Sequence, residues 1–175
     1  VRSRGLGDVY KRQVHFTTDS GNYNIPSDYE YTPADAGSKL FQVRFVTTGT
    51  TRLSVTDTAK ADVFGNAYID VTAGPAVSYS ISAPGAVQAG EIFYITVTVK
   101  DAYNNVVTDY SETASFTSSD PQSVPGNGLP EDTLFASGDS GVKILAVTLK
   151  TKGIQTITGT EVGNSAVKGT SNGIM

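Results

Sequence analysis

The chain has 175 residues, a formal net charge of −4 at pH 7, no cysteine and 38% hydrophobic residues. This length accommodates one large or two small domains, and the negative charge argues against non-specific nucleic-acid binding. The lack of cysteine excludes disulfides and thiolate chemistry, and no apolar run approaches the roughly 18 residues of a membrane-spanning helix. Frequent glycine, serine and threonine, without a long helical periodicity, predict an all-β protein.

The first segment, residues 1–13 (VRSRGLGDVYKRQ), is basic and lacks the alternation seen downstream. No apolar stretch follows its charges, so it does not have the form of a signal peptide. The hexapeptide DVYKRQ matches the translation of a transposon-end adapter used in sequencing libraries. We therefore interpret 1–13 as a non-native, adapter-derived segment of a metagenomic fragment, and expect it to make no packed contacts.

The remainder contains an internal repeat with an offset of about 100 residues. Residues 14–18 (VHFTT) correspond to 114–118 (ASFTS), and 31–37 correspond to 135–141. Two further matches follow in the same order, 41–45 with 145–149 and 48–53 with 152–157. This period is the size of one immunoglobulin-like sandwich.

The phase of the repeat predicts two modules of unequal completeness. Residues 14–75 match only the later part of a module, so this first module lacks its early strands. Residues 76–175 form a nearly complete module whose last strand is clipped. Gly74 and Pro75 mark the boundary between the two.

Short strands separated by turn residues are predicted throughout the second module. Alternation is clearest in 91–100, where Phe93, Ile95, Val97 and Val99 share one face. The predicted core also contains Phe116, Leu145, Val147, Leu149 and Ile157. The predicted strands are 77–82, 93–100, 106–108, 113–118, 134–135, 142–150, 155–159 and one near 167–175. Their spacing is typical of a β-sandwich rather than a parallel sheet.

Four of these runs resemble the tandem bacterial immunoglobulin-like (Big or invasin-like) repeats of large surface and secreted proteins. They are VTVKDAYNN at 97–105, FTSSDP at 116–121, ASGDSGV at 136–142 and KGIQTIT at 152–158. The resemblance covers 14–175 and implies tandem immunoglobulin-like β-sandwiches, the first truncated at its N-terminal side, at the cell surface or outside the cell. Typical members have glycine where this chain has Asn104 or Asn105. The tryptophan and cysteine pair of antibody domains is absent.

Catalytic chemistry has little support in the sequence. The only histidine is His15, so no second histidine is available for a triad, and no G-x-S-x-G motif occurs. No phosphate-binding G-x-x-x-x-G-K-[ST] motif is present either. We predict that the chain is not an enzyme.

Calcium is the one cofactor that the sequence raises. Asp101, Asn104 and Asn105 share one turn, while Asp120 and Asp139 lie in others. Calcium binds six to eight oxygen ligands from such groups. The alternative, which we favour, is that these residues serve the turns themselves.

Tyrosines suggest a second kind of site. Tyr79, Tyr94, Tyr103 and Tyr110 lie in or near the early strands of the second module. They would form a sugar-stacking surface or, as we prefer, cover the outer face of a sheet.

These observations lead us to expect a non-catalytic extracellular repeat that acts as a spacer, stalk or adhesive element of a larger bacterial surface protein. The alternative is a carbohydrate- or protein-binding accessory module of a secreted hydrolase. The expected partners are neighbouring repeats of the same chain, together with a host or matrix protein or a glycan. Nucleic acid is not an expected partner, and we expect no membrane span in this fragment.

Overall fold

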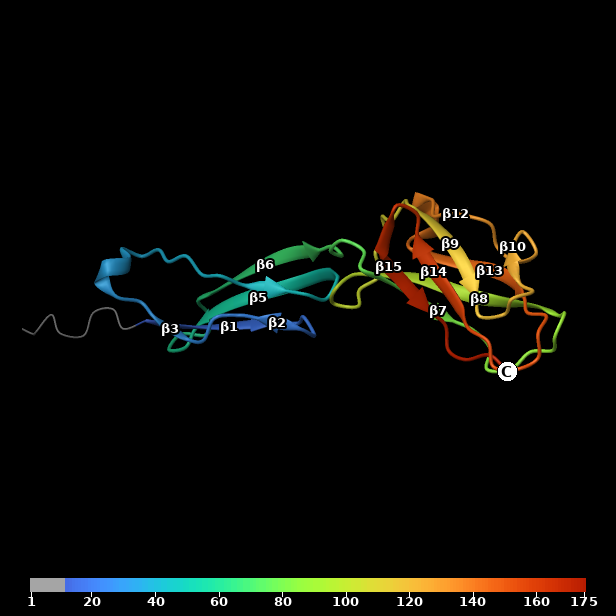
Figure 1. Cartoon of the computed structure of the whole chain (residues 1–175). Helices are drawn as coiled ribbons and strands as arrows, with labels where there is room; N and C mark the ends of the chain where they lie inside the picture. Colours follow the sequence, from blue (N-terminus) through green and yellow to red (C-terminus); the bar gives the residue numbers. More distant parts are fainter. Residues whose placement is uncertain (1–11) are drawn as a thin grey trace, which may run out of the picture. The chain divides into compact units, whose positions relative to one another are not determined.

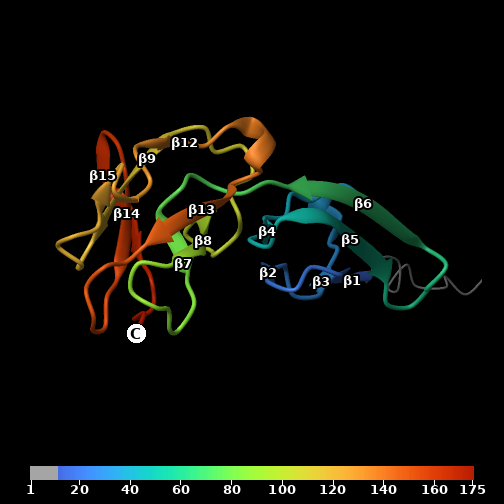
Figure 2. The same ribbon diagram turned by 90° about the vertical axis from the view of Figure 1, so that its right-hand side faces the viewer.

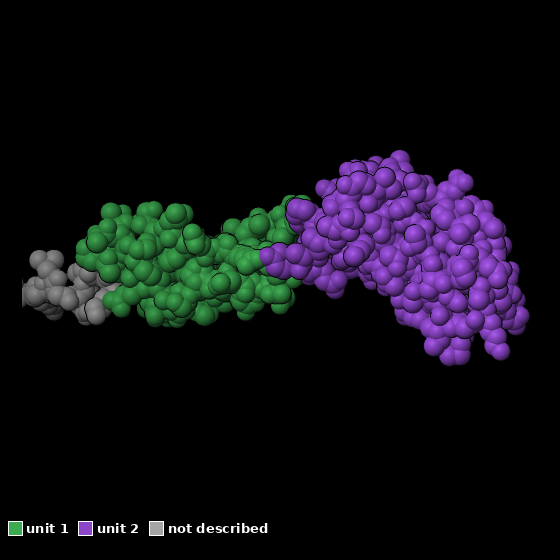
Figure 3. Space-filling view, viewed as in Figure 1, with its two compact units in different colours: residues 1–72 green, residues 73–175 purple. Residues whose placement is uncertain are grey.

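The computed structural model describes residues 12–175, which divide into two compact units (Figures 1 and 3). Unit 1 is Val1–Thr72 and unit 2 is Ala73–Met175. In the described part every regular element is a strand except two short 3-10 turns, so the fold class is all-β. None of the described residues belongs to a helix long and apolar enough to cross a membrane.

Unit 1 is built on a four-stranded antiparallel sheet with the order β3-β1-β5-β6. Its strands are β1 (Gln13–Thr18), β3 (Tyr29–Glu30), β5 (Gly49–Asp57) and β6 (Phe64–Val71). A smaller antiparallel pair joins β2 (Tyr23–Asn24) to β4 (Arg44–Phe45), and the 3-10 turn η1 is Pro33–Asp35. The sheet places β6 at one edge.

Unit 2 contains a seven-stranded sheet with the order β12-β9-β14-β15-β7-β8-β13. In Figure 2, β9, β14 and β15 lie on one side of unit 2 and β7, β8 and β13 on the other. Its strands are β7 (Ser78–Ser82), β8 (Ile92–Lys100), β9 (Thr113–Ser118), β12 (Thr133–Leu134), β13 (Val142–Thr148), β14 (Ile157–Glu161) and β15 (Asn164–Thr170). β10 (Val124–Pro125) and β11 (Gly128–Leu129) form a separate parallel pair, and η2 is Ser137–Asp139. Within the seven-stranded sheet only β15 and β7 run parallel.

One hydrophobic cluster fills unit 2 and draws on both halves of this sheet. The alternating residues Phe93, Ile95, Val97 and Val99 of β8 are all buried in it, as predicted. Phe116, Val147, Leu149 and Ile157 are buried in the same cluster, whereas Leu145 is only partly buried against it. Burying each large apolar side chain stabilises the fold by about 1.5–3 kcal/mol before the entropic cost is counted. Unit 2 is therefore a β-sandwich.

The two units share a topology and a register. The order β3-β1-β5-β6 in unit 1 corresponds to β12-β9-β14-β15 in unit 2. Thr18 pairs with Leu53 across β1 and β5, and Ser118 pairs with Ile157 across β9 and β14. Thr18 and Ser118 are 100 residues apart, and Leu53 and Ile157 are 104 apart, which are the two offsets of the sequence repeat. Residues of the two units can therefore be compared one by one.

Three strands differ clearly from the prediction, and the boundary between the units differs as well. Residues 106–108 form only an isolated bridge between Val106 and Lys100, because the chain turns inward there and buries Val107. The later strands begin at Ile157 and Asn164, so the expected strands 155–159 and 167–175 are shifted along the chain. The division between units falls at Thr72 and Ala73, three residues before the predicted boundary.

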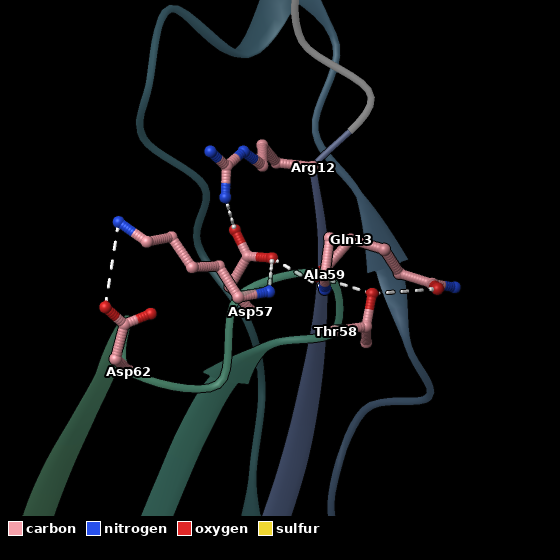
Figure 4. Close-up of polar contacts among 7 residues, drawn as sticks. Arg12, Gln13, Asp57, Thr58, Ala59 and Asp62 are labelled. Carbon is pink, nitrogen blue, oxygen red and sulfur yellow. Dashed lines mark hydrogen bonds and ion pairs between the residues drawn. The ribbon is translucent and has the colours of Figure 1, made fainter.

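The expectation that residues 1–13 make no packed contacts is wrong for the last two of them (Figure 4). Gln13 begins β1, and its carbonyl accepts a hydrogen bond of 2.9 Å from the Thr58 N–H. The guanidinium of Arg12 lies 2.6 Å from the carboxylate of Asp57. A strand is extended through backbone N–H and C=O groups, which every residue except proline supplies in full. Residues 1–11 lie outside the described part.

Candidate interaction surface

Asp101, the central residue of the proposed calcium turn, is buried beneath N–H donors. One carboxylate oxygen accepts the backbone N–H groups of Tyr103 (2.9 Å) and Asn105 (2.8 Å). The other accepts the Gly74 N–H at 3.0 Å and the Asn105 side-chain amide at 2.9 Å. Burial raises the pKa of Asp101, but these hydrogen bonds outweigh it and the pKa lies below its usual value. The carboxylate thus organises its own turn, which is the role favoured for it from the sequence, and calcium binding there stays the alternative.

Asn104 contributes conformation rather than a side-chain contact to this turn. Its φ is +67°, in the left-handed region that asparagine tolerates better than most residues. Asparagine is therefore compatible with a position at which the repeats that the sequence resembles have glycine. Its carbonyl oxygen accepts a hydrogen bond from Lys100 Nζ at 3.2 Å.

Asp120 plays the same role in a second turn and is almost wholly buried. Its carboxylate accepts the N–H groups of Gln122, Lys150 and Thr151, together with the hydroxyls of Ser123 and Thr151. Burial opposes ionisation, yet the hydrogen bonds, with that from the Thr151 hydroxyl foremost, hold its pKa well below the usual range. Asp120 therefore ties β9 to the segment that follows β13.

Asp139 and its unit 1 counterpart Asp35 cap the two 3-10 turns in the same way. Asp35 accepts the Thr32 N–H at 2.8 Å, and Asp139 accepts the Ala136 N–H at 2.6 Å. Each also pairs with the lysine four residues on, and the Thr32 backbone contact contributes most to lowering the pKa of Asp35 to about 2. Within the described part, no group of three or more His, Asp or Glu side chains is placed to hold a metal ion.

The tyrosines do not form one surface. Tyr79 and Tyr110 are buried in the core, where their hydroxyls lie 2.5 Å apart. The ring of Tyr79 stacks on Phe135 at 6.2 Å. Only Tyr94 and Tyr103 are exposed. Both interpretations of the four tyrosines, a sugar platform and an outer cover, are thus wrong for Tyr79 and Tyr110, whose rings supply apolar area and whose hydroxyls satisfy each other.

His15 lies on the exposed side of β1, where its Nδ1 is 2.6 Å from a carboxylate oxygen of Asp28. No serine or threonine hydroxyl is recorded against the ring among the described residues. An exposed polar contact of this kind contributes little to stability. His15 therefore has the surroundings of a surface residue.

An open, mainly apolar surface lies on unit 1. A groove of about 650 Å³ runs over the inward faces of β1, β5 and β6 and the η1 turn. Its walls include Val14, Tyr31, Val55, Val63 and Gly65. At one end Arg12 holds the pKa of Asp57 below its usual value, so this carboxylate stays charged and paired (Figure 4).

Sequence reasoning did not single out these groove residues. The signal for them was present in the repeat, because residues 14–75 lack a match for the early strands of the second module. A sheet face whose covering strands are unmatched is expected to be open.

Comparison with known proteins gives structural likenesses alone, because the sequence matches no known protein family and no curated protein. The D0-D1 domain of intimin is 16% identical, with a TM-score of 0.40 over 99% of this chain and 85% of that one. Domains 4 and 5 of the S-layer protein SbsC are 18% identical, with a TM-score of 0.36 over 97% of this chain and 74% of theirs. A glycosyl hydrolase family 2 member from Bacteroides cellulosilyticus is 16% identical, with a TM-score of 0.45 over 93% of this chain and 23% of its own.

Proposed function

We propose that the chain is a non-catalytic, extracellular structural repeat that serves as a spacer or stalk in a larger bacterial surface protein. The observation that carries the proposal is the repetition itself. Two consecutive units share one strand order, one register and one braced turn, with Asp35 and Asp139 in equivalent places. A fold duplicated in series extends a chain by a fixed step, whereas a single binding site needs only one copy.

The short, anchored segment between the units supports the spacer role. β6 ends at Val71 and β7 begins at Ser78, so the connection is short. Within unit 2, Ala73 packs against the core and the Gly74 N–H is held by Asp101. A connection anchored in this way has fewer free backbone dihedrals than a flexible linker of equal length.

The turns held by Asp101 and Asp120 would also make the module stiff, as a spacer requires. Asp101 and Asp120 each satisfy several donors from separate parts of the chain, and both are buried. Charged acceptors form the stronger protein hydrogen bonds, so these turns resist local opening. Adhesion, the finer alternative within this proposal, would require a receptor surface in addition to these braces.

Small-angle X-ray scattering of chains with two, three and four copies of residues 73–175 in series tests the proposal. A stiff spacer gives a maximum dimension that rises by a constant increment per copy. A rise with the square root of copy number would show freely jointed modules and contradict it. Specific binding of the same chains to a glycan array would instead favour the accessory-module alternative.

A longer stretch of the gene supplies an independent check. Further copies of the repeat on either side would support the spacer function. A neighbouring catalytic domain would favour an accessory module of a secreted hydrolase.

A further inference from the structure

We propose that the groove of unit 1 binds an extended β-strand alongside β6, in the place that β7 occupies in unit 2. The occupant to which we commit is the first strand of a repeat of this type. Its chemistry follows β7, with an inward aromatic residue, a second inward apolar residue two positions later, and small polar residues facing out. This inference goes beyond the spacer function, because it assigns a binding partner to unit 1.

The inward face of β6 is bare where its counterpart in unit 2 is covered. Val63 is 49% exposed, whereas Val167, its equivalent at an offset of 104, is 3% exposed. Ala67 is exposed and its equivalent Ser171 is buried. The cover in unit 2 comes from β7, which pairs with β15. The exposed apolar face thus follows from the strand that unit 1 lacks among its described residues.

Gly65 of β6 lies where the absent strand would pass close to the sheet. A side chain on Gly169 of β15 would collide with the carbonyl oxygen of Tyr79, so β7 can approach only a glycine there. Gly65 is the equivalent residue, yet nothing lies within 4 Å of the position a side chain would take. Its backbone is not left-handed either, so neither the conformation nor the packing of unit 1 explains a glycine, which weakens a strand.

A tyrosine in the groove wall, Tyr31, is the aromatic partner that the strand would need. In unit 2 the ring of Tyr79 lies parallel to that of Phe135, at 6.2 Å and 9°. The equivalent of Phe135 is Tyr31, a half-buried wall residue of the groove. An inward aromatic side chain entering over Gly65 would therefore meet a ring, as Tyr79 does.

The edge of β6 fixes the direction of the strand. β6 is the last strand of the described sheet in unit 1, so one row of its backbone groups is available for pairing. β15 pairs with β7 in parallel, with Lys168 opposite Ser78. The equivalent of Lys168 is Phe64, so the bound strand would run parallel to β6 and place its outward residue opposite Phe64. Addition of a strand to an open edge is a common mode of peptide recognition.

Val55 in the groove wall would favour a strand whose sequence differs from that of β7 at one position. Unit 2 has Gly159 where unit 1 has Val55, and a side chain at Gly159 would press against Tyr79, Ile81 and Phe116. The groove is therefore shallower at this point. We expect its occupant to carry a residue smaller than isoleucine at the position of Ile81.

A tethered strand tests the proposal on the whole chain. A second copy of residues 76–83 with Ile81→Ala, placed before Val1 on a Gly/Ser linker of about 20 residues, has an effective concentration in the millimolar range. Hydrogen exchange of the amides of residues 63–69 is then followed by NMR. We expect exchange at least tenfold slower than in the parent chain, in a monomer.

Two matched variants separate strand binding from general stabilisation. Gly65→Val in the tethered chain should restore fast exchange, because the added side chain blocks the approach of the strand. Gly21→Val, at a glycine that also has free space, should leave the protection in place. Tyr79→Ser in the tethered copy should abolish protection.

Unchanged exchange in the tethered chain would overturn the proposal, as would protection that survives Gly65→Val. A dimer of the untethered chain with β6 already protected would also overturn it, because the occupant would then be a second copy.

Discussion

Tyr79 is the residue on which β7 depends in unit 2, and its replacement measures how firmly that strand is seated. Its side chain is 4% exposed, stacks on Phe135 and meets the edge of Tyr110 at 6.1 Å. Removing a buried ring of this size leaves a cavity and costs about 3–5 kcal/mol. We therefore expect Tyr79→Ala to lower the free energy of unfolding of unit 2 by that amount.

Tyr79→Phe measures what the hydroxyl alone contributes to the stability of unit 2. Tyr79→Phe keeps the ring and loses only the hydrogen bond to Tyr110, whose hydroxyl still donates to Glu161 at 2.6 Å. One neutral hydrogen bond contributes about 0.5–1.5 kcal/mol, so the expected cost is near 1 kcal/mol. Tyr94→Ala, at an exposed residue of β8, is the control and should change stability by no more than about 0.5 kcal/mol.

Urea unfolding of the whole chain, followed through assigned NMR signals of unit 2, gives these three values. A cost below about 1 kcal/mol for Tyr79→Ala would refute the reasoning. It would show that β7 is dispensable in unit 2, and the equivalence between β7 and the groove of unit 1 would lose its basis.

Four further outcomes are expected. Asp120→Asn should destabilise unit 2 at pH 7, and the stability difference from the parent should narrow below about pH 4. The stabilisation from a depressed carboxyl pKa is complete above the unfolded-state pKa and is lost as the pH falls from there toward the folded-state pKa; equal urea midpoints at pH 7 would contradict this. Val97→Asp should abolish dispersed NMR signals of unit 2, because an unpaired buried charge costs several kcal/mol. Residues 14–71 alone should be disordered or aggregate, and a dispersed amide spectrum would disprove it, whereas 76–175 should fold. Calcium should leave the melting temperature unchanged relative to EDTA, because the Asp101 carboxylate already accepts N–H donors; a rise of several degrees would show that calcium binds the folded chain and would contradict this.

Local patterns predicted much of unit 2. The alternation in β8 identified four buried residues correctly, because period-two burial is a property of the strand itself. The landmarks of the internal repeat lie in the same strand register in both units, as the Thr18–Leu53 and Ser118–Ile157 pairs show.

Other features depend on contacts that no local pattern encodes. Tyr79 and Tyr110 are buried in the core, where their hydroxyls lie within hydrogen-bonding distance although 31 residues of sequence separate them. The sequence favours turn roles for Asp101 and Asp120, but their distant donors, the Gly74 N–H for Asp101 and the Thr151 N–H for Asp120, follow only from the tertiary structure. Arg12 lies in the segment interpreted as foreign, yet it pairs with Asp57.

Residues 38–44 show how far a strand depends on its neighbour. They are the equivalents of β13, yet residues 38–43 form no strand in unit 1, and Leu40 is 91% exposed. In unit 2, β13 pairs with β8 alone, at seven successive positions. No equivalent of β8 occurs among residues 12–72, so the segment has the pattern of a strand without a partner to form one. The open groove beside β6 and the irregular 38–43 segment therefore have one cause. In unit 2, β7 and β8 lie between β15 and β13, the counterparts of these two regions, and no equivalent of either strand occurs among residues 12–72.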